Sequence, residues 1–147
     1  MNTELNALQK NISFQTIVVT NKIIESIDKH TKDFNKNEFF SFSDTSKIIS
    51  EKYFSFLAEI SPLVSELNSL NSGLASLLIK ADKTMDIDLI ILCENKFNAF
   101  EKFEISLYEY TSSIEKAIET SKATQIFFIN ATQKLKTALQ NLIKENI

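Results

Sequence analysis

The sequence of 147 residues contains one glycine, one proline, no tryptophan and no arginine. Tight turns and phosphate-binding loops depend on glycine, so its scarcity argues against an all-β fold and against a Rossmann-type domain. The absence of arginine removes the side chain that grips guanine and phosphate with two parallel hydrogen bonds. Together with a net charge of −3, this composition predicts that the chain does not bind nucleic acid.

Cysteine and long apolar runs are also scarce. Cys93 is the single cysteine, which excludes an intrachain disulfide and a cysteine-based zinc site. The first ten residues, MNTELNALQK, lack the basic and apolar regions of a secretion signal. No apolar run approaches the ~18 residues of a membrane-spanning helix. We therefore expect a cytoplasmic protein with no transmembrane segment.

The titratable residues form no pattern that predicts catalysis, a metal site or a cofactor. Di-iron bundles use Glu-x-x-His, whereas His30, the single histidine, has Ile27 three residues before it. We interpret His30 as part of a helix C-terminal turn, where it interacts with the helix dipole. Cys93 could act as a nucleophile with His30 as its base. Because Cys93 falls in an apolar series, however, we interpret it as a small packed side chain and expect no enzyme.

Helical periodicity is clearest between Ile49 and Ala81, where apolar residues recur at alternating steps of four and three. Further apolar residues beside this series widen the stripe to the width that a bundle helix needs. Pro62 lies within the stripe without shifting its phase. We therefore predict one helix over 44–82 with a kink near Pro62. The alternative is a separate helix that Ser61 caps, with Pro62 at its first position.

Three further segments have helical periodicity, at residues 2–31, 86–119 and 122–147. The predicted fold is all-α: one domain, residues 1–147, formed by an antiparallel bundle of three to four long amphipathic helices with coiled-coil-like heptads. A break after residue 86 is expected because an unbroken helix to the end would be about 93 Å long.

Two places fit the break between the last two helices. Ser112–Glu115 has the Ser-x-x-Glu form of a capping box. Residues 119–125 are where the apolar series turns polar. The sequence does not decide between these places.

Two short stretches are apolar on every side of a helix, whereas a surface helix should have one apolar stripe. Either they lie in the centre of the bundle, or they contact a second subunit, another protein or an apolar surface. If they are contacts, the protein should be at least dimeric. The two stretches are Leu89-Ile90-Ile91-Leu92-Cys93 and Ile126-Phe127-Phe128-Ile129.

The predicted connector between the first two helices, residues 32–43, is unusual because it is rich in phenylalanine. Connectors are normally polar, since they run over the surface. Phenylalanines ahead of a helix can pack on its first turns when Ser43, Asp44 or Thr45 caps it. The connector phenylalanines are Phe34, Phe39, Phe40 and Phe42.

Residues 39–59, FFSFSDTSKIISEKYFSFLAE, resemble the middle of phasins, the small helical proteins that coat polyhydroxyalkanoate storage granules in bacteria. The match lies in the order of an apolar connection, a polar turn over residues 43–45 and a helix that opens over residues 48–53. The sequence departs from many phasins in being rich in Ile, Phe, Asn and Ser rather than Ala and Gln. The resemblance implies that some of Phe39, Phe40 and Phe42 anchor in an apolar surface, where each buried phenylalanine contributes about 1.5–3 kcal/mol; on the structural interpretation they close the end of the bundle.

We therefore expect a non-enzymatic protein that binds through apolar helix faces. The first specific hypothesis is a phasin-like coat on a storage granule. The alternative is a protein–protein interaction module, such as an adaptor, chaperone or secretion-system partner, that forms a bundle with itself or with another helical protein. The candidate contact residues are Phe39, Phe40, Phe42, Leu89, Ile90, Ile91, Ile126, Phe127, Phe128 and Ile129.

Overall fold

The computed structural model describes residues 2–32 and 42–147, and the side chains from Thr45 onward in the second range. These residues form four helices and no strand, which confirms the predicted all-α bundle. The helices are α1 (Thr3–Thr31), α2 (Phe42–Lys83), α3 (Ile87–Glu119) and α4 (Gln125–Asn146).

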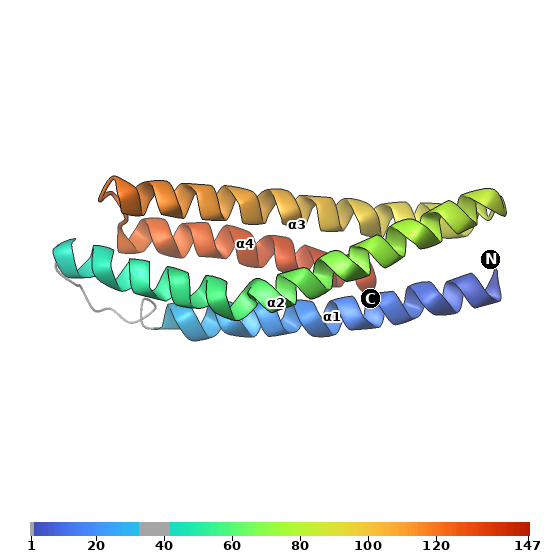
Figure 1. Ribbon diagram of the computed structural model, residues 1–147, viewed down its shortest axis with the longest axis horizontal. Helices are drawn as coiled ribbons and strands as arrows, with labels where there is room; N and C mark the ends of the chain where they lie inside the picture. The colour runs from blue at the N-terminus through green and yellow to red at the C-terminus, as the bar shows by residue number, and fades with distance from the viewer. Residues whose placement is uncertain (1, 33–41) are drawn as a thin grey trace.

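Consecutive helices run in opposite directions, and α4 returns between α3 and α1 (Figure 1). With 22 residues, α4 is shorter than α2, which has 42. It therefore stops short of the end at which α1 begins, and that end of the bundle contains α1, α2 and α3 (Figure 1). Large side chains from three helices fill the centre, including Tyr53, Phe56, Phe100, Phe103 and Phe128.

Helix α2 is continuous through Pro62, as predicted. Figure 1 shows α2 changing direction near its middle, where its colour passes from teal to green. Proline lacks the N–H that a helix needs and its ring crowds the carbonyl of the preceding turn, which explains the bend. Ile60 and Leu67 are both buried, at 2% and 1% exposed, so the apolar stripe keeps facing the core across the bend. The alternative of a new helix at Ser61 is wrong.

The start of α2 corrects a second expectation. The helix begins at Phe42, so Ser43, Asp44 and Thr45 lie within it and none of them is its cap. A periodic pattern locates a helix end only to within a residue or two, which explains the error. Phe34, Phe39 and Phe40 of the predicted connector lie outside the described residues.

The break between α3 and α4 lies at residues 120–124, the second of the two predicted places. Ser112 and Glu115 are inside α3, so the capping-box interpretation is wrong. The helix continues through this point because Tyr110, Ile114 and Ala117 carry its buried face onward.

The short α2–α3 and α3–α4 turns both place a non-glycine residue in the left-handed conformation. Met85 has a φ of 55° and Ser121 a φ of 57°. The N–H of Asp86 donates to the carbonyl of Ala81 at 3.0 Å, which is the longer hydrogen bond of a Schellman motif. Helix α3 ends in the same way around Ser121. A chain with so little glycine thus makes glycine-type turns at an energetic cost.

Side-chain caps begin three of the helices. Asn2 accepts a hydrogen bond from the N–H of Leu5, Asp86 from that of Leu89, and Thr124 caps α4 in the same way. The backbone N–H of Asn2 also donates to Asp86 Oδ2 at 2.6 Å. This contact holds the starts of α1 and α3 together and lowers the pKa of Asp86. Across the described residues, no helix is both long and apolar enough to cross a membrane.

Candidate interaction groove

The first apolar stretch is divided between the core and the surface. Leu89 and Cys93 are fully buried, whereas Ile91 is 53% exposed. Ile90 is half-buried and packs against the core. Burial in the centre of the bundle therefore explains Leu89 and Cys93 but leaves Ile91 on the surface of α3.

The second stretch is divided in the same way. Phe128 is buried in the core and Ile129 packs against it, while Ile126 is 72% exposed and Phe127 37% exposed. The two stretches do not meet, because α3 and α4 are antiparallel and begin at opposite ends of their shared face (Figure 1).

A groove runs between α3 and α4 on the surface. It consists of a larger hollow of about 690 Å³ and a smaller one of about 390 Å³. Ser106 of α3 and Lys134 of α4 line both hollows, so the two hollows adjoin each other. The larger hollow extends toward the end of α4, where Lys144 and Glu145 line it, and the smaller one toward the start of α4 at Phe127.

Small side chains from both helices line the groove and leave room in it. Ala99 and Ser106 lie seven residues apart on α3, and Ala131 and Ala138 lie seven residues apart on α4. Residues seven apart lie on the same side of a helix. The small residues thus recur at the level of each hollow, and a larger side chain from elsewhere could pack there.

Large apolar side chains are exposed within this groove. Ile105 lines the larger hollow and is 52% exposed, and Phe127 lines the smaller one. Sequence reasoning predicted Phe127 but missed Ile105. The signal for Ile105 was its position outside the heptad series of α3, which left a large apolar side chain with no place in the predicted core.

The larger hollow is positively charged. Lys102 of α3 and Lys134 and Lys144 of α4 line it, with one acid, Glu145. The smaller hollow combines Lys134 with Glu109. Polar uncharged side chains also line the larger hollow, namely Asn95, Asn98, Ser106, Thr137 and Asn141.

A buried lysine lies at the same level of the bundle, inside it. Lys96 of α3 is 5% exposed, and its Nζ donates to Gln9 Oε1 at 2.6 Å and to Ser13 Oγ at 2.7 Å. Burial lowers the pKa of Lys96, while Cys93 and Glu145 oppose that change. Because Glu145 is next to the last residue of α4, the ammonium lies near the C-terminal end of α4, where the helix dipole favours a cation.

Sequence reasoning missed this cluster. Lys96 stands three residues after Cys93 and four before Phe100, in phase with the buried face of α3. A charged residue on the buried face of a helix indicates a buried polar cluster, because lysine is almost never buried without a partner. Its two partners on α1, Gln9 and Ser13, could not be assigned without knowing which helix lies opposite.

His30 and Cys93 lie far apart in the bundle, so they do not form a nucleophile–base pair. Burial raises the pKa of the Cys93 thiol, which makes it a poor nucleophile. His30 lies in the last turn of α1, as predicted, and its Nδ1 donates to the carbonyl of Ser26 at 2.8 Å. Its ring packs edge-to-face against Phe56, with the two ring centroids 5.9 Å apart. The start of α3 lies beside the start of α1, so most of the length of α1 separates His30 from Cys93.

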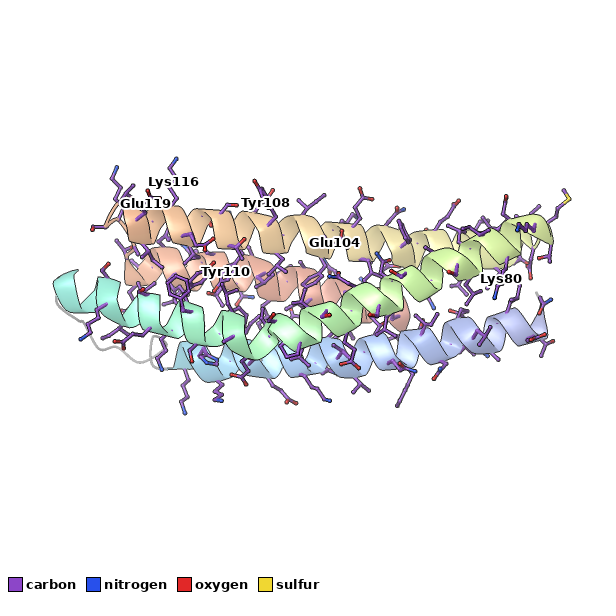
Figure 2. All side chains as sticks on the ribbon, in the orientation of Figure 1. Lys80, Glu104, Tyr108, Tyr110, Lys116 and Glu119 are labelled. Carbon is purple, nitrogen blue, oxygen red and sulfur yellow. The ribbon has the colours of Figure 1, made fainter. Side chains whose placement is uncertain are left out.

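A second groove, of about 490 Å³, lies between α2 and α3. Tyr108 borders it and points away from the bundle, whereas Tyr110, two residues later, points inward (Figure 2). Tyr108 is 73% exposed and Tyr110 3% exposed. Burial raises the pKa of Tyr110 to about 12.

In the part of the chain that the structure describes, no three His, Cys, Asp or Glu side chains are grouped so that they could hold a metal ion. No protein-family model, no curated protein and no solved structure matches the chain. The phasin resemblance therefore stays a prediction. Of the residues that carry it, Phe39 and Phe40 lie outside the described residues, and Phe42 is the first residue of α2.

Proposed function

We propose that this protein is a non-enzymatic interaction module that binds a helix of another protein in the groove between α3 and α4. The observation that carries the proposal is the coincidence, in one groove, of heptad-spaced small residues with the exposed side chains of Ile105 and Phe127. Small residues provide room for a partner side chain, and exposed apolar side chains gain free energy when a partner covers them.

The geometry of the groove supports a helical partner. Two parallel or antiparallel helices form a groove that a third helix can enter, with its side chains packing between theirs. The hollows follow one another along the helix axes because they share Ser106 and Lys134. A partner helix can therefore contact both hollows with one face.

Large apolar side chains are exposed outside the groove as well, and two pairs lie one helical turn apart: Phe14 and Val18 on α1, and Ile87 and Ile91 on α3. Phe14 on α1 is 66% exposed and Phe54 on α2 is 52% exposed. The ring contact between His30 and Phe56 places these two residues at the same level of the bundle, so Phe14 and Phe54 lie roughly 25 Å apart along it. Exposed apolar residues are common on protein surfaces, and Ile105 and Phe127 are distinguished from those outside the groove by lining its hollows.

The proposal can be tested by site-specific photo-crosslinking in the native host. A photoreactive phenylalanine derivative replaces Phe127 in the groove or, as the matched control, Phe54 on α2. Both positions are exposed phenylalanines, so the substitution is the same in kind. We expect a crosslinked product of defined mass from Phe127 and none of that mass from Phe54. Equal yields from the two positions, or no product from Phe127, would refute helix binding in the groove.

The storage-granule coat is the second proposal, and it is carried by the phasin-like segment at residues 39–59. It predicts that the purified protein floats with polymer particles or lipid droplets. Replacing Phe39, Phe40 and Phe42 with serine should then release the protein while the melting temperature stays nearly unchanged. If the three phenylalanines cover the end of the bundle instead, the same substitutions should lower the melting temperature. Failure of the unsubstituted protein to float would remove the coat hypothesis.

A further inference from the structure

We infer that the partner of the α3–α4 groove is an acidic amphipathic helix whose large apolar side chains lie seven residues apart; this rests on the proposed function. The charge of the groove is the first argument. Lys102, Lys134 and Lys144 surround the larger hollow with a single acid, Glu145, although the whole chain has a net charge of −3. A locally positive groove on an acidic protein attracts an acidic partner and disfavours a basic one.

The spacing of the hollows defines the apolar anchors. Ala138 lies in the larger hollow and Ala131 in the smaller one, seven residues earlier on α4. Seven residues of helix span about 10.5 Å, and a partner helix along the groove repeats its own face at the same interval. Two leucine-sized side chains at positions i and i+7 of the partner therefore reach both hollows.

The uneven charge along the groove orients the partner. The smaller hollow has Glu109 beside Lys134, so it favours neither sign strongly. The lysines that stand apart from that acid, Lys102 and Lys144, line the larger hollow toward the end of α4. The acids of the partner should thus flank the anchor in the larger hollow, and the anchor beside Phe127 should have neutral neighbours.

The test uses two synthetic helical peptides of about 18 residues, which span about 27 Å. Both carry leucines seven residues apart on one face. One has glutamates beside the first leucine, and its twin has lysines there. Binding to the full-length protein is measured by fluorescence anisotropy at low and high salt. We expect the glutamate peptide to bind roughly tenfold tighter at low salt, because three exposed ion pairs contribute about 0.6–3 kcal/mol in total and a tenfold difference in affinity is about 1.4 kcal/mol. The preference should shrink as salt screens the charges.

Two variants locate the binding. Reversing the rim with Lys102→Glu and Lys144→Glu should make the lysine peptide the tighter ligand. Filling the larger hollow with Ala138→Trp should abolish binding of the glutamate peptide. Ala58→Trp, on the exposed side of α2, is the matched control and should leave binding unchanged.

The outcomes separate this inference from the proposed function. Equal affinity for the two peptides, tighter binding of the lysine peptide, or no binding of either peptide would overturn the acidic partner. A crosslink from Phe127 in the host would still support helix binding in those cases. If that crosslink is absent while the glutamate peptide binds as described, the groove accepts acidic helices but the proposed function in the host is wrong.

Discussion

Replacing Lys96 with methionine should destabilise the protein, although it removes a buried charge. Methionine keeps the apolar stem but deletes the ammonium, and with it two short hydrogen bonds to Gln9 and Ser13. Hydrogen bonds to a charged group are worth about 1.5–3 kcal/mol each. The variant also regains the several kcal/mol that burial of an ammonium costs, so these two effects largely cancel.

What remains is the acceptor that the variant leaves behind. Ser13 can donate its hydroxyl to a carbonyl of the preceding helical turn, as serines in helices do. Gln9 Oε1 has no such choice, and Gln9 is 3% exposed. A buried unpaired acceptor costs about 1–3 kcal/mol, which is the expected loss in the free energy of unfolding.

The assay is urea unfolding at pH 7, followed by circular dichroism at 222 nm. Lys116→Met is the surface control, because Lys116 is exposed and points away from the bundle (Figure 2), and it should stay within about 0.5 kcal/mol of the unsubstituted protein. The triple variant Lys96→Met, Gln9→Leu, Ser13→Ala removes donor and acceptors together and should recover most of the loss. A single variant that is as stable as the unsubstituted protein would refute the argument.

The pH dependence gives an independent check on Lys96. Its pKa is lower in the folded than in the unfolded protein, whose value is 10.5, so the folded state disfavours the charged form. This cost is present below the lowered pKa and is relieved as the pH rises toward 10.5. The unsubstituted protein should therefore gain stability relative to Lys96→Met as the pH rises through the lowered pKa toward 10.5. Parallel stability curves for the two proteins would show that the ammonium is not buried.

Three further predictions concern other parts of the bundle. The pKa of Tyr110 rises from 10.0 to about 12 on folding, so the protein should lose stability between these pH values. Tyr110→Phe has no phenol to titrate, so from pH 8 to pH 11 it should lose about 1.4 kcal/mol less unfolding free energy than the unsubstituted protein, as measured by urea unfolding. An equal loss in both proteins would contradict the raised pKa of Tyr110. Gly73→Ala should raise the free energy of unfolding by about 0.5–1 kcal/mol, because the new Cβ would meet Ile12 at an ordinary 3.5 Å within a helix; thermal unfolding would show a lower melting temperature if that space is not available. Met85→Gly and Ser121→Gly should each stabilise by a similar amount, since both residues have positive φ, and calorimetry that finds no gain would argue against the left-handed turns.

The sequence by itself determined which segments are helical and which residues form most of the core. Apolar periodicity depends only on the geometry of a helix, so it marked the buried face of α2 from Ile49 to Ala81 and kept that face in phase across Pro62. The helix ends were less well determined. A capping box at Ser112–Glu115 and a polar stretch at residues 119–125 both fitted the end of α3, and only the continued burial of Ile114 and Ala117 decided that the break lies after Glu119.

The tertiary structure decided everything that depends on which helices are neighbours. Ile105 and Phe127 belong to one groove because α4 packs antiparallel to α3 at a particular register, and a heptad pattern fixes neither the neighbour nor the register. The same holds for Lys96, whose partners are 83 and 87 residues away in the chain. A sequence shows that such a lysine needs partners, but only the arrangement of the bundle, with α1 across from α3, supplies them. Burial and hydrogen bonding are properties of positions in space rather than of positions in the chain.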